Sequence, residues 1–452
     1  MTERNFLQEV LSSIRGRGRR LFDFSGEQPL ADPQLEMACE ALLSSLGEAS
    51  GAALAERILK TYESRGAEGR HAFFTLLANR FGIDPDEAVA SAIAYRDAPG
   101  PQTMQRFHDA AEPRRQELLR RLNMAPGATA KLVAMRTDLL KVLPDDASLR
   151  EVDMDFRHIF QSWFNRGFLE ARRINWNSPA VILDRIIRYE AVHEISDWDD
   201  LRRRIDLPDR RLYAFFHPRL ADDPLIFVEV AFTADTPATI ASILSTDRQM
   251  TDPERARTAV FYSISNCQDG LRGISFGNLL IKQVVEDLRR ELPNIRTFVT
   301  LSPVPAFARW LAAERQETAG AIDAASREKL ALLDRPGWWE DGDAVASLAP
   351  VVNGLAAHYL VNARDGNGAP CDPVARFHLG NGARLERINW LADLSAGGLR
   401  NGHGVMVNYL YKPEEIERNH ESFVNAGTIP ASNAVLRLAK PYAATRTPAT
   451  VS

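Results

Sequence analysis

The spacing of apolar residues divides the chain into two regions with different periods. From residue 33 to about 172, apolar residues recur at steps of three and four, as at Leu54 and Ile58. This is the spacing of one face of a helix. Asp84 and Pro85 begin one such segment with a capping acid and a proline in the first turn. The pattern predicts an all-α bundle.

From about residue 210 the apolar residues form short runs rich in β-branched and aromatic side chains, which is typical of strands. The predicted strands cover residues 211–217, 225–233, 258–265, 296–302 and 405–411. Helical patterns lie between them, at residues 236–245, 277–292, 305–315 and 384–395. Residues 314–350 are predicted to be a polar excursion carrying one helix. Strands that alternate with helices predict an α/β domain with a mixed sheet.

The period changes between residues 165 and 180, where we place the boundary of two domains. The 452 residues of the chain are more than one hydrophobic core usually organises. We therefore expect a helical domain over residues 1–172 and an α/β domain over residues 173–452.

The formal net charge of −5 argues against a general nucleic-acid-binding protein, because such proteins carry a strong basic excess. The arginines near the N-terminus could bind nucleic acid, but in view of the net charge a solvated arm is the preferred interpretation; they are Arg15, Arg17, Arg19 and Arg20.

The sequence indicates a reducing, cytoplasmic location. Its three cysteines, at positions 39, 267 and 371, lie too far apart for a CxxC zinc or disulfide motif. No apolar run approaches the roughly 20 residues that span a bilayer, so we expect no membrane partner. Glu3 and Glu9 are unlike the acid-poor composition of a transit peptide.

A glycine-containing turn at residues 266–278 joins a predicted strand directly to a predicted helix. Gly273 and Gly277 allow backbone N–H groups to approach a ligand, and Arg272 adds a positive charge. Together with the helix dipole, these features favour a pyrophosphate-type anion. The alternative is that the glycines only end a strand and cap a helix. The turn lacks the P-loop GK[ST] and the dinucleotide GxGxxG.

Ser302 follows the next predicted strand and precedes Pro303 and Pro305, which restrict the backbone to a rigid corner. The serine is a candidate catalytic group. The alternative is a helix N-cap, a common position for serine. No G-x-S-x-G motif surrounds it, which disfavours an esterase-type nucleophile.

His378 is the histidine with the most distinctive surroundings. It directly precedes residues 379–382, a predicted glycine-flanked turn where the backbone can come close to a substrate. No partner at metal-ligand spacing accompanies it, so no metal site is predicted. Histidine titrates near neutral pH and can act as an acid or base, although a structural role stays open.

Several segments together resemble the malonyl-CoA decarboxylase family. They are MAPGATAKLV (124–133), NWNSPAVIL (175–183), AVHEISDW (191–198), FYSIS (261–265), LRGISFGNLLIK (271–282), LSPVPAFARWL (301–311) and PVARFHLGNGARLERINWLADLS (373–395). The turn at 272–278 also resembles the acyl-CoA pyrophosphate loop of GNAT acyltransferases, with Ser275 where a glycine is usual.

The resemblance implies a helical N-terminal domain that contributes to oligomer contacts, in a dimer or tetramer, and a GNAT-like acyl-CoA-binding domain. It implies that malonyl-CoA is converted to acetyl-CoA and carbon dioxide with no metal or redox cofactor. Ser302 and His378 would be the catalytic pair, and Ser263 and Tyr411 would line the acyl pocket. The residues implied to hold the CoA pyrophosphate are Arg272, Gly273, Ile274, Ser275, Phe276, Gly277 and Asn278.

The mechanism that we expect from this resemblance uses the thioester as the electron sink. Ser302 would hydrogen-bond the departing carboxylate and accept a proton in its pair with His378, and His378 would protonate the α-carbon. The alternatives are a GNAT-type acyltransferase that moves an acyl group to an amine, and a non-catalytic acyl-CoA sensor.

Overall fold

The computed structural model describes residues 29–44, 47–274, 279–317 and 322–443, which divide into two compact units. The first unit is the described part of Met1–Phe168 with His217–Ala221 and Gln268–Ser275. The second is Leu169–Phe216 and Asp222–Cys267 with the described part of Phe276–Ser452. The predicted fold class, an all-α region followed by an α/β domain with a mixed sheet, is confirmed. The predicted boundary between residues 172 and 173 stays a prediction.

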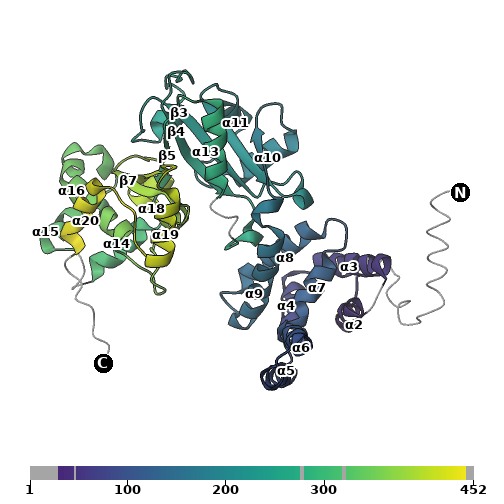
Figure 1. The fold of residues 1–452 in the computed structure, drawn as a ribbon. Coiled ribbons are helices and arrows are strands. Elements are labelled where there is room, and N and C mark those ends of the chain that lie inside the picture. The colour runs from purple at the N-terminus through teal and green to yellow at the C-terminus, as the bar shows by residue number, and fades with distance from the viewer. Residues whose placement is uncertain (1–28, 45–46, 275–278, 318–321, 444–452) are drawn as a thin grey trace. The chain divides into compact units, whose positions relative to one another are not determined.

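The first unit consists of helices (Figure 1). They are α2 (Asp32–Leu43), α3 (Glu48–Glu63), α4 (Ala67–Arg80), α5 (Pro85–Asp97), α6 (Pro101–Ala111), α7 (Arg114–Leu122), α8 (Ala128–Val142) and α9 (Arg150–Trp163). Leu54 and Ile58 are buried, as the helical period predicts. Asp84 caps α5 by accepting hydrogen bonds from Asp86 N and Glu87 N, which confirms the predicted start of that helix.

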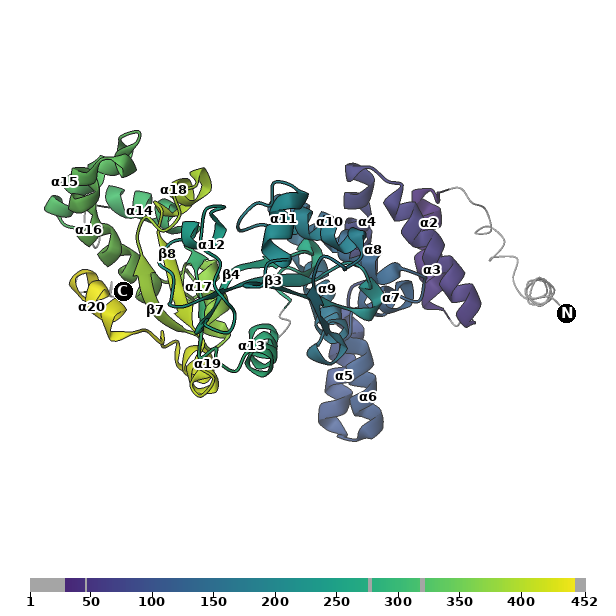
Figure 2. The ribbon, with the colours of Figure 1, turned by 90° about the horizontal axis from the view of Figure 1, so that it is seen from above.

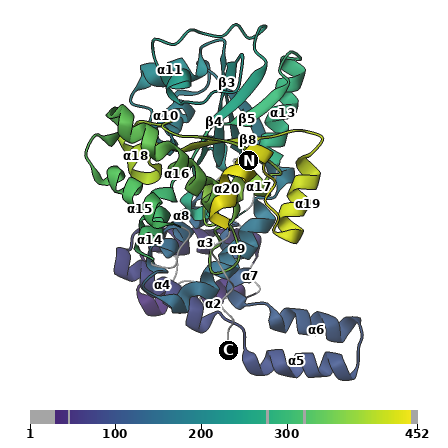
Figure 3. The same cartoon turned by 90° about the vertical axis from the view of Figure 1, so that its left-hand side faces the viewer.

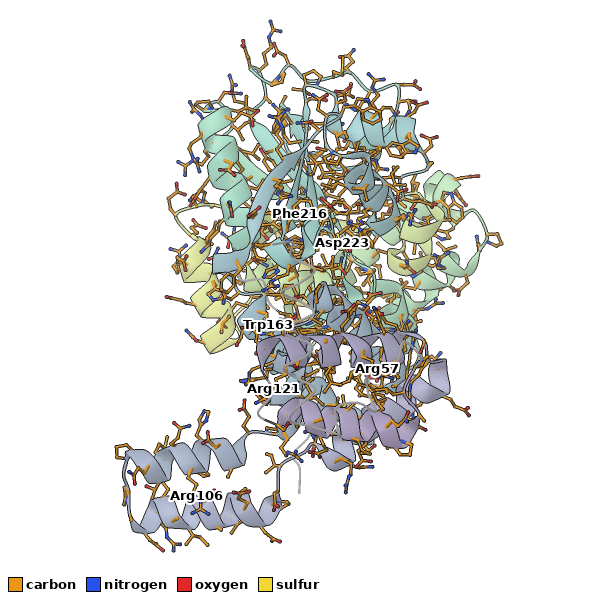
Figure 4. All side chains as sticks on the ribbon, turned by 90° about the vertical axis from the view of Figure 1, so that its right-hand side faces the viewer. Arg57, Arg106, Arg121, Trp163, Phe216 and Asp223 are labelled. Carbon is orange, nitrogen blue, oxygen red and sulfur yellow. The ribbon has the colours of Figure 1, made fainter. Side chains whose placement is uncertain are left out.

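Helices α5 and α6 form a hairpin that projects from the other helices of this unit (Figure 3). Figure 4 shows Arg106 on the hairpin, away from Arg57 and Arg121 in the body of the bundle. Tyr95 of α5 stacks on Phe107 of α6, with ring centroids 6.2 Å apart. The two helices thus stabilise each other.

A short segment from later in the chain packs into the first unit. It contains the 3₁₀ helix η5 (Asp269–Leu271), which lies against α8. A Cβ atom at Gly270 would lie only 1.9 Å from Val133 O, so this approach requires glycine. Arg136 of α8 donates from Nη1 to Gly270 O (2.7 Å) and to Arg272 O (2.9 Å).

The second unit is built on an eight-stranded sheet with the order β1-β2-β3-β4-β5-β8-β6, in which β7 also pairs with β8. Figure 2 shows strands β3, β4, β7 and β8 of this sheet. The strands are β1 (Glu170–Ile174), β2 (Arg210–Phe216), β3 (Ile226–Thr233), β4 (Thr258–Asn266), β5 (Thr297–Thr300), β6 (Ser302–Pro303), β7 (Arg384–Asn389) and β8 (Met406–Leu410). The β4–β5 pair is parallel and the other pairs are antiparallel.

Helices pack on the sheet and extend beyond its β7–β8 end. They are α10 (Ala180–Tyr189), α11 (Trp198–Ile205), α12 (Ala241–Leu244), α13 (Leu279–Glu291), α14 (Phe307–Gln316), α15 (Ala324–Leu330), α16 (Gly342–Val361), α17 (Pro373–Gly380), α18 (Ala396–Gly402), α19 (Ile416–Ala426) and α20 (Asn433–Ala443). Ile186 of α10 and Leu201 of α11 pack in one core cluster with Leu212 of β2 and Phe227 of β3. Burial of such side chains is the main stabilising term for this packing.

A β-bulge lies in the middle of the β3–β4 pair. Glu229 pairs with Ser263 and Val230 pairs with Phe261, so Tyr262 is an extra residue on β4. Bulges bend a strand and often redirect side chains beside functional sites.

The β4–β5 pair ends just beyond this bulge, at Phe261 and Thr300. The chain then pairs with β8 instead, through Ser302 and Val407. Strand β4 continues to Asn266 with β3 as its partner. The end of β4 and the start of β6 therefore separate.

Several predicted elements differ from those in the structure. Residues 384–395 do not form a helix, because Arg384–Asn389 is strand β7 and pairs with β8. Residues 170–172 belong to strand β1 and not to the helical region. Residues 314–350 carry more than one helix, since α15, short 3₁₀ turns and the first half of α16 all lie there.

Helix α16 was not predicted, although it is apolar for most of its length. Among the described residues it is the one helix long and apolar enough to cross a membrane by length and composition. More than half of that apolar window is buried inside the structure, and the helix packs against α14, α15, α20 and β7. These contacts are those of a core helix.

Candidate active site

A cavity of about 230 Å³ lies where β4 and β6 separate, within the second unit. Its walls come from β4, β6, α17 and the loop between α10 and α11. The lining residues are Phe261, Tyr262, Ile264, Asn266, Ser302, Pro303, Pro373, Val374, Phe377, His378 and Val192. Most of them are apolar. The cavity brings Ser302 and His378 together, although they are far apart in the sequence.

Ser302 is placed by the backbone of β6, which pairs with β8. It does not cap a helix, because α14 begins at Phe307 after Ala306, so the N-cap alternative is wrong. Its Oγ atom lies 3.0 Å from His378 Nε2 and 2.9 Å from Thr300 Oγ1. Ser302 therefore has a hydrogen-bonding partner on each side.

His378 lies in the last turn of α17, and the predicted glycine-flanked turn follows it, with Gly382 at a φ of 79°. The glycines of that turn end the helix. Asp372 begins the helix by accepting from Val374 N (3.0 Å) and Ala375 N (2.9 Å). The imidazole stacks on Tyr409, with ring centroids 4.6 Å apart. A capped helix and a stacked ring hold His378 rigidly.

Burial keeps His378 neutral, because desolvation lowers the pKa of its imidazole to about 3. Tyr411 Oη lies 2.8 Å from Nδ1, and burial raises the pKa of this phenol well above its usual value. The protonated phenol donates to Nδ1, and the neutral ring then carries its hydrogen on Nε2 and donates it to Ser302. Ser302 donates in turn to Thr300 Oγ1, which also accepts from Tyr409 N (3.1 Å).

Ser263 lies beside the cavity wall and bonds to Glu190. Its Oγ donates to the Glu190 carboxylate at 2.8 Å, and Ser265 Oγ donates to the same group at 3.1 Å. The backbone N–H groups of Val192 (2.8 Å) and His193 (2.7 Å) also donate to Glu190. Ser263 and Tyr411 thus contact residues that shape the cavity, and their predicted role at the substrate stays a prediction.

Arg204 of α11 holds the same loop from its other side. Its guanidinium donates to His193 O (2.7 Å) and Glu194 O (2.8 Å) and forms an ion pair with Asp200 at 3.1 Å. It also lies 3.5 Å from Glu229. Glu229 is fully buried on β3, and this desolvation raises its pKa to about 8.

The predicted pyrophosphate turn is only partly described. Gly273 has a φ of 77°, a left-handed conformation that favours glycine. The Arg272 side chain is 70% exposed and pairs with Asp269 at 3.2 Å. The guanidinium of Arg157, an exposed residue of α9, lies 3.8 Å from the position that a Cβ of Gly273 would take. Two arginines therefore flank the turn in the first unit.

The remaining predicted residues of the turn are Ile274, Ser275, Phe276, Gly277 and Asn278. Ile274 is buried, so it anchors the turn and does not offer a side chain to a ligand. Ser275, Phe276, Gly277 and Asn278 lie outside the described residues.

Sequence analysis missed Thr300, Glu190 and Arg204. Strand periodicity could have identified Thr300, because residues two apart on a strand share a face and Thr300 precedes Ser302 by two. Glu190 and Arg204 carry no local motif, and only the fold places them at the loop. Within the described ranges, no group of three or more His, Cys, Asp and Glu side chains could hold a metal ion.

Two family models match the chain. The model of the malonyl-CoA decarboxylase C-terminal domain matches residues 167–449, and that of the N-terminal domain matches residues 81–164. The mitochondrial malonyl-CoA decarboxylase of Rattus norvegicus is 35% identical over 395 residues, which are 80% of this chain and 80% of that protein. The mitochondrial enzyme of Anser anser anser is 36% identical over 349 residues, covering 72% of this chain and 69% of its own length. The cytoplasmic location stays a prediction.

Solved structures lead to the same family. The malonyl-CoA decarboxylase from Rhodopseudomonas palustris has a TM-score of 0.87 and 54% identity, covering 90% of this chain and 100% of that chain. The malonyl-CoA decarboxylase from Agrobacterium vitis has a TM-score of 0.86 and 53% identity, with 90% and 99% coverage. Matches over both regions of the chain, at this identity and coverage, show that it belongs to the malonyl-CoA decarboxylase family of carboxy-lyases.

Proposed function

We propose that this chain decarboxylates malonyl-CoA to acetyl-CoA and carbon dioxide, with Ser302 and His378 as the catalytic pair and without a metal or redox cofactor. The observation that carries the proposal is the buried series Tyr411–His378–Ser302 at the wall of an apolar cavity. Family membership supplies the reaction, and the cavity supplies a place for it.

The apolar cavity favours loss of the carboxylate. Residues such as Phe261, Ile264, Val374 and Phe377 line it, so a carboxylate held there exchanges water for a less polar environment. Decarboxylation moves the negative charge onto the thioester enolate, where it is delocalised, and releases neutral carbon dioxide. The thioester is the electron sink, so the protein has to orient the carboxylate and supply one proton.

The proton passes along the hydrogen-bonded series. The Ser302 hydroxyl donates to the carboxylate and, once the C–C bond has broken, gives its proton to the α-carbon. This differs from the expected delivery by His378, because Nε2 of His378 faces Ser302 and Nδ1 faces Tyr411. His378 Nε2–H replaces the proton on Ser302, and the proton of Tyr411 moves to Nδ1. Solvent restores the proton lost from this series as product leaves. General-acid assistance of this kind contributes a rate factor of about 10²–10⁴.

We assign CoA pyrophosphate binding to the turn at residues 272–278. The left-handed Gly273 and the exposed guanidinium groups of Arg272 and Arg157 support this assignment. Exposed arginines neutralise a diphosphate and keep it exchangeable with solvent. Ile274 would contribute its backbone, because its side chain is buried.

The test is carbon dioxide release from malonyl-CoA by purified, chelator-treated protein, with acetyl-CoA followed by chromatography. We expect one carbon dioxide and one acetyl-CoA for each malonyl-CoA consumed. An acyl product that appears only when an amine is added would favour the acyltransferase alternative. Malonyl-CoA that binds and stays intact would favour the sensor alternative.

We also propose that the chain forms a homo-oligomer through the α5–α6 hairpin. Val89, Ile93 and Met104 are exposed apolar residues on this projecting hairpin, and burying them against a second copy would be favourable. Light scattering of Val89→Asp and Ile93→Asp proteins tests this. A wild-type protein that is monomeric at micromolar concentration would contradict it.

A further inference from the structure

We infer that Val192 limits the size of the substituent at C2 of the acyl group, so that the cavity accepts malonyl and discriminates against methylmalonyl. We further infer that Glu190 is the positioning residue that holds Val192 in place. The inference rests on the proposed decarboxylation, and it names a specificity determinant for that reaction.

Val192 forms the one wall of the cavity that the catalytic segments do not supply. Among the described residues that line it, Ser302 and Pro303 come from β6, and the others except Val192 come from β4 and α17. Changing the β4, β6 or α17 residues would move the catalytic pair or its supports. Val192 can therefore set the free volume beside the reacting carbon independently of the chemistry.

Glu190 fixes the loop of Val192 to the sheet. Its carboxylate accepts from the backbone N–H groups of Val192 and His193 and from the hydroxyls of Ser263 and Ser265. The two serines lie on β4, the strand that also lines the cavity. These hydrogen bonds join the loop of Val192 to β4.

Arg204 fixes the following residues by their carbonyl groups, at His193 O (2.7 Å) and Glu194 O (2.8 Å). The loop is therefore held on both sides of its backbone by buried or half-buried charged groups. We expect the backbone of this loop to move little when a substrate carries an extra methyl group. A loop held by packing alone would shift more easily and discriminate less.

The expected discrimination follows from general magnitudes. One methyl group in an apolar pocket changes kcat/KM by about 10- to 200-fold. We expect the wild-type protein to prefer malonyl-CoA over racemic methylmalonyl-CoA by a factor in this range.

The first test compares both substrates on Val192→Ala and Val192→Ile. The alanine variant should raise the ratio of methylmalonyl to malonyl kcat/KM by about 10-fold or more, because it opens space beside C2. The isoleucine variant should lower the same ratio. Val181→Ala is the matched control, since Val181 is 45% exposed at the start of α10 and is not a lining residue.

The outcomes separate this inference from the proposed function. A wild-type protein that releases no carbon dioxide from malonyl-CoA overturns the proposed function. A ratio that stays within about twofold of wild type in Val192→Ala overturns the inference alone. If Val192→Ala does not fold, Val192→Ile decides, and an unchanged or raised ratio in that variant overturns the inference.

The second test concerns the positioning role of Glu190. Glu190→Gln keeps the size of the side chain but replaces one acceptor oxygen with a donor. We expect the methylmalonyl to malonyl ratio to rise about threefold, the effect of one lost hydrogen bond, with malonyl kcat less affected than the ratio. Equal losses on both substrates would show a merely structural residue and overturn the positioning role.

Discussion

Ser302 and His378 are 6% and 2% exposed, whereas the Arg272 side chain is 70% exposed. The region around Ser302 and His378 holds neutral groups in a continuous series of hydrogen bonds, whereas the turn at Arg272 carries a solvent-exposed ion pair with Asp269. Proton transfer requires desolvated groups in fixed geometry. Capture of a diphosphate requires charges that attract it from solvent. The two regions therefore have opposite physical properties.

The largest effect is expected at the buried region. Ser302→Ala and His378→Asn should each lower kcat by about 10²–10⁴-fold, because each interrupts the proton path. Single-turnover assays with malonyl-CoA would measure this. The exposed residues Ser162→Ala and His108→Asn serve as matched controls. Near-normal turnover in both catalytic variants would refute the role of the pair.

A smaller effect is expected one step further from the substrate. Tyr411→Phe should lower kcat about 10-fold with little change in KM, because His378 Nδ1 loses its buried donor. Steady-state kinetics measure both constants, and Tyr95→Phe on the projecting hairpin is the control. If Tyr411→Phe changed KM and left kcat unchanged, Tyr411 would contact the substrate rather than the imidazole.

The pH profile tests whether His378 works as a neutral group. Its pKa is lowered to about 3, so the neutral ring persists as the pH falls through 6.5, where an ordinary histidine gains a proton. We expect kcat to stay level from pH 8 down to about 5, within the range in which the protein is folded. A fall in kcat centred near pH 6.5 would contradict a buried neutral histidine.

The exposed region should respond through binding. Arg272→Ala and Arg157→Ala should each raise KM for malonyl-CoA by about 3- to 10-fold and leave kcat unchanged. The effect should shrink as salt rises from 50 to 200 mM, because exposed charges are screened. Arg255→Ala, an exposed arginine of the second unit, is the control. Salt-independent KM values would argue against this turn as the anion site.

A further prediction concerns the stability of the protein and the Arg204–Glu229 pair. The pKa of Glu229 is raised to about 8, so the folded protein retains a proton that the unfolded chain loses near pH 4.5. Stability should therefore fall as pH rises from about 5 to 8, by at most about 1.4 kcal/mol per pH unit. Urea unfolding at several pH values should show a flatter dependence for Glu229→Gln. The same slope in both proteins would contradict the assignment.

Local periodicity was sufficient for the elements whose pattern is strong. Leu54 and Ile58 predict helix α3, and the aromatic and β-branched runs predict β2, β3 and β4, all of which the structure contains. The failures have a common cause. Arg384–Asn389 has apolar residues three apart at Leu385 and Ile388, which suits a helix, but pairing with β8 makes it a strand.

Helix α16 was missed for a different reason, because a nearly uniform apolar segment shows no periodic pattern. It is apolar on most sides because it is packed by α14, α15, α20 and β7, so no polar face marks a helical period. Strand β1 is also hidden, since EARRI has few apolar residues and becomes a strand through its pairing with β2.

The sequence by itself determined the family, the order of an all-α and an α/β region, and Ser302 and His378 as candidates. These depend on residue types and local spacing, which the chain carries wherever it folds. Only the tertiary structure decided that Ser302 meets His378 and Thr300, that Tyr411 fixes the imidazole, and that Glu190 and Arg204 hold the loop of Val192. These contacts join residues of different strands, helices and loops, and their protonation states follow from burial, which no local pattern contains.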